Sequence, residues 1–325
     1  MTRVASVQAA FDAALAGVVH GRSEPPPLDT PGELTLAYFV GAHGWHGFVV
    51  EAGRVRAVAM GDVDATAARD ALSTKLLAPF DSELGRARRI AVLAYDAARS
   101  VDVHALPWRG APLGAAVGVV YPLDRAARGA SLDTIASPRV LLVADPTSDL
   151  KGARAELESV ANALTNSGGW AVTVLRDKRA TGDAVRSGLA SADLFHYAGH
   201  GRFAGRDGWA SALRLAEHGE LSVADILALP RAPRAVFLLG CDTARDSGEA
   251  DGQGLGLAQA FLVVGARAVV AASRPVDDAA TAAIATEIYA RLTTEVDVAE
   301  TMRAVVAAAT ARGLTGWDAF RVLAP

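Results

Sequence analysis

Two short stretches decide the fold that this sequence predicts. DLFHYAGHG, residues 193–201, and RAVFLLGC, residues 234–241, each contain an apolar run of strand length that ends beside glycine and a reactive side chain. Continuous apolar runs of this length are typical of strands that are buried on both faces of a parallel sheet. The sequence therefore predicts an α/β protein in which His200 and Cys241 each follow the carboxyl end of a strand.

Segments of strand and helix character alternate around these two stretches. The alternation favours a mostly parallel sheet that is covered by helices on both faces. The expected strands are residues 140–146, 170–176, 193–199, 234–240 and 266–272, and the expected helices are residues 153–165, 181–189, 222–229, 255–265, 277–292 and 298–312.

The chain before residue 139 has a different pattern. An amphipathic helix is expected first, and the four prolines among residues 23–33 then predict an extended linker. A three-stranded meander follows at residues 34–40, 47–51 and 54–60. A helix is expected at residues 62–77, with Asp62 or Asp64 as its N-cap, and two further strands at residues 89–95 and 118–121. We therefore expect a helix and linker at residues 1–33, a smaller subdomain at residues 34–138 and the main α/β body at residues 139–325.

The composition excludes several classes of protein. Of the 325 residues, 51% are hydrophobic and 21% are charged, which suits a sizeable buried core and excludes a disordered or fibrous chain. The 32 basic and 36 acidic residues give a net charge of −4, which offers no electrostatic footprint for nucleic acid or an anionic membrane. No apolar run reaches the roughly 20 residues that span a bilayer. Gln8 and Asp12 interrupt the apolar segment that a signal peptide would need.

Cys241 is the only cysteine of the chain. An internal disulfide framework and a cysteine-rich zinc site are therefore excluded. A lone thiol is compatible with the reducing cytosol, so we expect a cytoplasmic protein. Only three of the 32 basic residues are lysines, which together with the many alanines and glycines suggests a GC-rich bacterial genome.

The positions of His200 and Cys241 suggest a site for acyl transfer. The two residues are 41 positions apart, which corresponds to one excursion through a strand and a helix. If their strands are neighbours, the imidazole and the thiol face one crevice, where the imidazole can take the proton of the thiol. The backbone N–H groups near Gly201 and Cys241 would then hold a developing oxyanion.

Two other interpretations of these residues stay open at this point. A single cysteine in such an apolar chain is often a small buried hydrophobic residue. His196 lies four residues before His200, so the spacing also allows a metal site of His196, His200, Cys241 and Asp242. His196 equally suits a core position.

The sequence resembles the CHAT domain, a family of caspase-like cysteine peptidases related to separase and gingipain. The resemblance rests on FHYAGHGRF, on VFLLGCDTA and on the GLAQAFLVVGARAVVAASRPVDDAAT segment that follows, all in the family's order. It implies that His200 is the catalytic histidine, Cys241 the nucleophile and Gly201 an oxyanion donor. It also implies a caspase-like three-layer sandwich, preceded by a degenerate protease-like subdomain, and chemistry that needs no metal or cofactor.

The same resemblance suggests three residues of the substrate pocket, namely Asp145, Leu239 and Arg274. The family commonly has tryptophan where this chain has Arg274, so the substrate preference is open. Arg274 would favour an acidic substrate side chain through a bidentate contact, whereas Asp145 would either neutralise Arg274 or favour a basic side chain. Alternatively, Arg274 pairs with Asp277 or Asp278 at the start of a helix.

The function implied by the resemblance is cleavage of a specific protein in a bacterial stress or antiviral defence pathway. A gasdermin-like pore-forming protein is a candidate substrate, and a protein encoded nearby is a candidate regulator. Direct binding to nucleic acid or to a membrane is not expected. The alternative is a protease-like module that binds a peptide without cutting it, and a third hypothesis is a hydrolase with a metal at the two histidines.

Overall fold

One sheet runs through the described chain, which consists of residues 32–123, 137–202, 204, 208–239, 256–292 and 297–325 of this computed structural model. Its eleven strands are β1 (Glu33–Gly41), β2 (Gly44–Glu51), β3 (Arg54–Gly61), β4 (Arg89–Ala94), β7 (Gly118–Pro122), β8 (Arg139–Ala144), β9 (Ala171–Arg176), β10 (Leu194–Ala198), β14 (Ala235–Leu238), β15 (Ala268–Ala272) and β16 (Phe320–Ala324). They lie in the order β3-β2-β1-β4-β7-β16-β15-β14-β10-β8-β9. Within this sheet only the pairs β1–β2, β2–β3 and β15–β16 are antiparallel.

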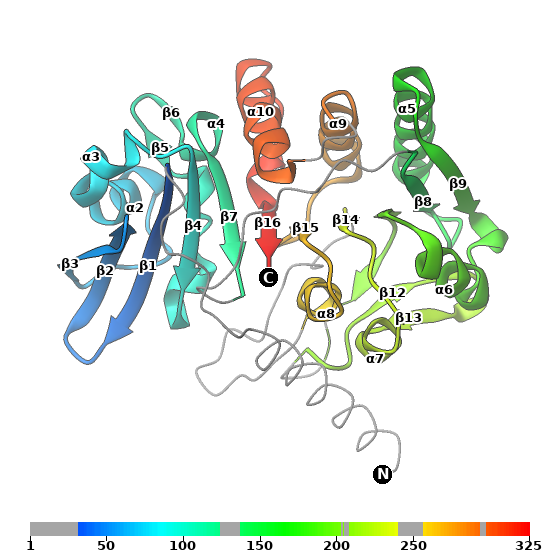
Figure 1. Ribbon diagram of the computed structural model, residues 1–325, viewed down its shortest axis with the longest axis horizontal. Coiled ribbons are helices and arrows are strands. Elements are labelled where there is room, and N and C mark those ends of the chain that lie inside the picture. The colour runs from blue at the N-terminus through cyan, green and yellow to red at the C-terminus, as the bar shows by residue number, and fades with distance from the viewer. Residues whose placement is uncertain (1–31, 124–136, 203, 205–207, 240–255, 293–296) are drawn as a thin grey trace, which may run out of the picture.

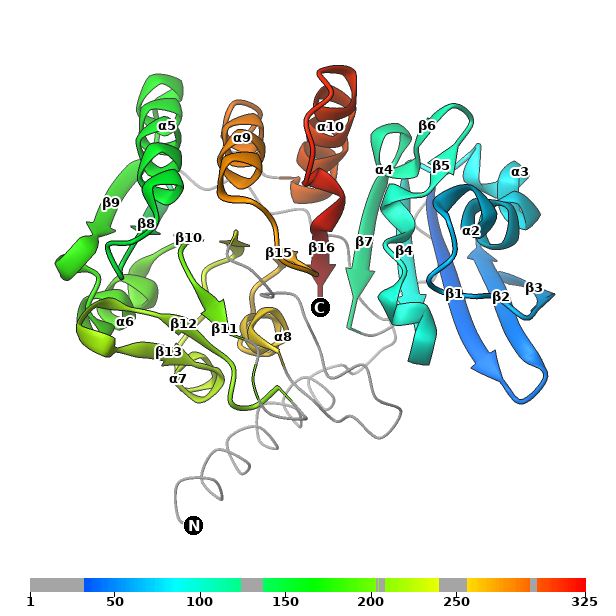
Figure 2. The same ribbon diagram turned by 180° about the vertical axis from the view of Figure 1, so that it is seen from behind.

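Helices cover both faces of the sheet (Figures 1 and 2). In the second half of the chain, one face carries α5 (Lys151–Ser167), α9 (Asp278–Tyr289) and α10 (Val298–Ala311). The opposite face carries α6 (Gly182–Ser191), α7 (Val223–Leu227) and α8 (Leu257–Val263). A separate hydrophobic core fills each of the two interfaces. The expected α/β three-layer sandwich with a mostly parallel sheet is therefore confirmed.

The first half of the chain contains the expected meander of β1, β2 and β3, and it has a hydrophobic cluster of its own. The helices in this half are α2 (Arg69–Leu76), α3 (Asp81–Leu84) and α4 (Leu113–Ala116), and β5 (Pro107–Trp108) pairs with β6 (Ala111–Pro112). A short sheet of β11 (Gly201–Arg202), β12 (Ala212–Arg214) and β13 (Glu220–Ser222) lies in the second half. The expected helix at residues 3–19 and the linker up to residue 31 lie outside the described residues.

The expected start of the helix at residue 62 is wrong. The helix begins at Arg69 after Ala68, and no side chain caps it. The carboxylate of Asp64 instead accepts hydrogen bonds from the backbone N–H and the hydroxyl of Thr66, at 2.8 Å and 2.7 Å. Aspartate readily closes a local turn of this kind, and here the turn competes with helix capping.

The last strand joins the two halves of the molecule. β16 is antiparallel to β15 on one side and parallel to β7 on the other, so the end of the chain lies in the middle of the sheet (Figure 1). This strand was not expected as an element of its own. The sheet is continuous across the expected boundary after residue 138, and one hydrophobic cluster includes Ala105 and Val120 from before it.

None of the helices in the described part of the chain combines the length and the apolar character that a membrane span requires.

Candidate functional site

The strand that leads to His200 and the strand that leads to Cys241 are neighbours. β10 and β14 pair in parallel, with Tyr197 opposite Leu238, and the backbone N–H of Leu239 donates to the carbonyl of Tyr197 at 3.0 Å. The condition that the sequence left open, that the two strands be neighbours, is therefore met. Cys241 itself lies outside the described residues, as does Gly240, whereas Leu239 is the last described residue of this strand end.

The backbone of His200 is held firmly while its ring is half-exposed. The carbonyl of His200 accepts a hydrogen bond from the backbone N–H of Arg214 at 3.0 Å and lies 3.0 Å from the hydroxyl of Tyr197. Its Nε2 atom lies 3.2 Å from both carboxylate oxygens of Asp149. Among the described residues none is hydrogen-bonded to Nδ1, so this nitrogen is open to a further partner.

The glycine before His200 is required by close packing. A Cβ atom at Gly199 would lie 2.6 Å from the Tyr197 hydroxyl and 3.1 Å from Pro146. Any side chain at this position would displace the hydroxyl that contacts the His200 carbonyl. Gly201, the expected oxyanion donor, begins β11 and pairs with Leu213.

Asp145 organises the loop that carries Asp149. Its carboxylate is fully buried and accepts hydrogen bonds from the backbone N–H groups of Asp149 and Leu150, at 2.8 Å and 2.9 Å, and from Nε of Arg154 at 2.6 Å. The residue itself has a φ of +44°, a conformation that aspartate tolerates better than most residues. These three hydrogen bonds to the Asp145 carboxylate hold the turn that follows β8 and the start of α5.

Asp149, which the sequence did not single out, is the described residue that contacts the His200 ring. Hydrogen bonds from the Thr147 hydroxyl and, to a smaller extent, from His200 hold the pKa of the Asp149 carboxyl below its usual value. The carboxylate is therefore ionised at neutral pH and accepts the N–H of His200. A signal existed, because β8 is parallel to β10 and residues after both strands must meet at one edge of the sheet.

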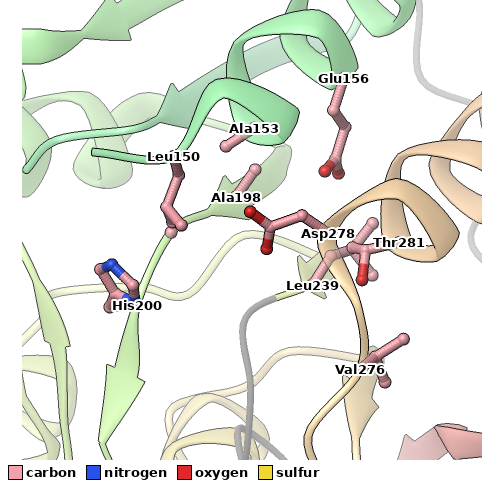
Figure 3. Close-up of a pocket in the computed structure, with 10 residues that line it drawn as sticks. Leu150, Ala153, Glu156, Ala198, His200, Leu239, Val276, Asp278 and Thr281 are labelled. Carbon is pink, nitrogen blue, oxygen red and sulfur yellow. The ribbon is translucent and has the colours of Figure 1, made fainter. Parts of the chain in front are cut away.

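A small cavity of about 30 Å³ lies beside His200. It is bounded by the first turns of α5 and α9 and by the ends of β10 and β14, as Figure 3 shows. Leu239, an expected pocket residue, lines it, together with Glu156, Asp278 and Thr281. Asp145 and Arg274 are not among the described residues that line this cavity.

Arg274 connects the two halves of the molecule. Its guanidinium contacts Asp102 in the first half at 2.6 Å and Asp318 near the C-terminus at 2.7 Å. The expected alternative, a pair with Asp277 or Asp278, is wrong. Asp277 instead caps α9 by accepting from the backbone N–H groups of Ala279 and Ala280, which places its carboxylate away from Arg274.

The two histidines near the strand end have separate surroundings. His196 is fully buried, with Nδ1 3.1 Å from the Tyr289 hydroxyl and Nε2 3.1 Å from Oε1 of Glu156. His200 instead contacts Asp149 at the surface. Within the described ranges, no three His, Cys, Asp or Glu side chains gather as a metal site would need. Cys241 and Asp242, the other members of the expected metal set, lie outside those ranges.

One comparison with known proteins identifies the type of domain. The family model of the CHAT domain matches residues 66–312. Among solved structures, two of the Saccharomyces cerevisiae separase–securin complex are similar to the chain, with TM-scores of 0.49 and sequence identities of 12% and 13%. Each match covers 73% of this chain but only 15% or 16% of the yeast chain. The complex of the RgpB pro- and mature domains of Porphyromonas gingivalis is similar with a TM-score of 0.48 and 14% identity, over 78% of this chain and 70% of that chain. No protein of curated function matches the sequence. Because the family model covers most of its length, the chain belongs to the CHAT domain family.

Proposed function

We propose that this protein is a cysteine endopeptidase in which Cys241 is the nucleophile and His200 is the general base. The observation that carries the proposal is the parallel pairing of β10 and β14, because it directs His200 and the chain that continues to Cys241 toward one edge of the sheet. Membership of the CHAT domain family supports the same assignment.

The chemistry follows from the surroundings of His200. Nδ1 of His200 takes the proton of the thiol, and the thiolate attacks the carbonyl carbon of the scissile bond. The imidazolium that forms is stabilised by the ionised Asp149 at Nε2. Backbone N–H groups of Gly201 and Cys241 hold the oxyanion, as we expected from the sequence. His200 then gives its proton to the leaving amine, and water hydrolyses the thioester with His200 as the base.

The biological setting is proposed from family membership and from the composition. We propose that the substrate is one protein, or a few, cleaved in a bacterial stress or antiviral defence response. A gasdermin-like pore-forming protein is the first candidate, and a separately encoded protein would regulate the cleavage. The lone cysteine supports action in the reducing cytoplasm.

A peptide chloromethyl ketone tests the proposal directly. The chain has a single cysteine, so any alkylated thiol found by mass spectrometry is Cys241. The wild-type protein should be labelled, Cys241→Ala should not, and His200→Ala should react about 100-fold more slowly, because general-base catalysis typically contributes at least this factor.

Iodoacetamide serves as the control probe, since it needs only an accessible thiol. If each probe reacts with His200→Ala as fast as it reacts with the wild type, the proposal is contradicted. That result would support the alternative, a module that binds a peptide without cutting it. Cleavage of a protein substrate that is lost with a chelator but survives Cys241→Ala would instead support the metal hydrolase.

A further inference from the structure

A second cavity lies at the carboxyl ends of β4 and β7, where these strand ends meet β16 and α8. Its volume is about 120 Å³. β7 is parallel to β16, which is antiparallel to β15, so β4 and β7 run in the direction opposite to β10 and β14. The cavity is therefore at the other edge of the sheet from His200, and the described residues that line it do not line the cavity beside His200.

Gln259 contributes an unpaired hydrogen-bond acceptor to the wall of this second cavity. The residue is only 7% exposed, and its Oε1 atom has no hydrogen-bond partner among the described residues. Buried polar atoms are nearly always hydrogen-bonded in folded proteins, so this oxygen points to a missing donor. Because Gln259 lines the cavity, a group that brings an N–H or O–H into the cavity would supply the missing hydrogen bond.

The rest of the wall suits an aromatic ring. Most of the lining residues are apolar or aromatic, and the volume approaches the roughly 150 Å³ of an apolar cavity known to hold a benzene molecule. Tyr95 and Leu123 line the cavity and are each 43% exposed, so the cavity opens at the surface of the protein. A tyrosine side chain combines an apolar ring with a donor at its tip, and it therefore matches both the space and the acceptor.

The charge of the wall is positive. Arg99 and Arg321 line the cavity, and neither aspartate nor glutamate is among the described residues that do so. Arg321 pairs with Asp102 at 2.6 Å, and its guanidinium lies over the ring of Tyr121, 4.8 Å from the ring centroid. A wall with two arginines favours an acidic group beside the entering ring.

The residues of this chain outside the described ranges cannot supply that ring. All five tyrosines and all five tryptophans of the sequence lie within the described ranges. Tyr38, Tyr121, Tyr197 and Tyr289 are buried, and Tyr95 is part of the cavity wall. The tyrosine that fits this cavity therefore comes from another protein.

We propose that this cavity anchors a protein partner through a tyrosine side chain that has an acidic residue beside it in the partner's sequence. The tyrosine hydroxyl donates to Oε1 of Gln259, and the acidic group faces Arg99. Tyr95 and Leu123 offer exposed apolar surface around the anchor, as is typical of the surroundings of a dominant aromatic side chain in a protein interface. This binding site does not depend on the role of Cys241, because it lies at the other edge of the sheet.

Three capped dipeptides test the proposal on the full-length protein, namely aspartyl-tyrosine, aspartyl-phenylalanine and asparaginyl-tyrosine. Their dissociation constants are measured by ligand-observed NMR titration. Loss of the hydroxyl in the phenylalanine peptide should weaken binding about fivefold, as expected for one hydrogen bond. Loss of the carboxylate in the asparaginyl peptide should weaken it about twofold to fivefold, as expected for an exposed ion pair.

Three variants locate the binding. Gln259→Met keeps the length of the side chain but removes the acceptor, so the tyrosine and phenylalanine peptides should bind it equally. Ala94→Phe places a ring in the cavity and should abolish binding of all three peptides. Ala171→Phe, an exposed control on β9 at the far end of the sheet, should leave the three constants unchanged.

The result that would overturn the proposal is equal binding of the tyrosine and phenylalanine peptides to the wild type, or no binding of either peptide. A tyrosine preference that persists in Gln259→Met, or binding that persists in Ala94→Phe, would overturn it as well. If Gln259→Met does not fold, Ala94→Phe decides, because Ala94 is only partly buried at the end of β4.

Discussion

Nε2 of His200 lies 3.2 Å from both carboxylate oxygens of Asp149, although the two residues are 51 positions apart in the chain. They meet because β8 and β10 are parallel neighbours, so the turns that follow them share one edge of the sheet. The contact turns the Nδ1 side of the ring toward other partners. Nδ1 has no hydrogen-bond partner among the described residues, as the proposed role of His200 as a base requires.

Replacing Asp149 should slow catalysis without weakening substrate binding. In Asp149→Asn the charge that stabilises the imidazolium is lost, and we expect kcat to fall about tenfold, because this half-exposed pair is screened by solvent. KM should change little, and Asp149→Glu should restore part of the rate. Steady-state cleavage of a fluorogenic peptide measures both constants, and an unchanged kcat would remove Asp149 from the mechanism.

Asp145 should matter for stability and, through the loop, for activity. Asp145→Ala leaves two backbone N–H groups and Arg154 without their acceptor, and we expect the free energy of unfolding to fall by about 2 to 3 kcal/mol. Urea denaturation followed by circular dichroism measures the change. Asp183→Ala is the control, because the Asp183 side chain is 97% exposed, and it should cost far less. Equal stability of Asp145→Ala and the wild type would refute the role of this carboxylate.

Gly199 should tolerate no side chain. In Gly199→Ala the new methyl group meets the Tyr197 hydroxyl, so the support of the His200 carbonyl is displaced. We expect labelling of Cys241 by a peptide ketone to slow by an order of magnitude or more. Gly265→Ala serves as a control for the loss of a glycine, since a Cβ atom there meets no atom within 4 Å, although its φ of +111° adds local strain. A Gly199→Ala protein that reacts like the wild type would show that the strand end adjusts.

His104 should make the stability depend on pH. Burial lowers the pKa of His104 to about 4, below the value of about 6.5 expected in the unfolded chain. The unfolded state therefore binds more protons between these values, and the stability that neutral His104 contributes is complete above pH 6.5 and is lost as the pH falls toward 4. From pH 7 to pH 5 we expect the wild type to lose about 2 kcal/mol more of its unfolding free energy than His104→Gln does. Parallel urea titrations check this, and equal losses would contradict it.

The sequence predicted the central strands well because each is a continuous apolar run. β10, β14 and β15 are buried at every position, and no other element of this length suits such a run beside glycine. The meander of β1 to β3 was predicted from its turns. β16 was not predicted as a strand, because its pairing depends on tertiary structure. It pairs with β7, which lies about two hundred positions away in the chain.

The site could be predicted only in part. The reactive residues at strand ends, His200 among them, followed from the α/β pattern. Asp149 did not, since a carboxylate in a turn has no distinctive spacing, and only the pairing of β8 with β10 brings it to His200. The alternative pair of Arg274 with Asp277 or Asp278 was wrong because Asp102, its actual partner, lies in the other half of the chain and is brought to it only by the tertiary structure.

Whether Cys241 is the nucleophile is best tested by cleavage of a peptide library, read by mass spectrometry, with the wild-type protein, Cys241→Ala and His200→Ala side by side. We expect defined cuts by the wild type and no cuts by Cys241→Ala. Cuts that persist in Cys241→Ala would contradict the assignment of the thiol as the nucleophile.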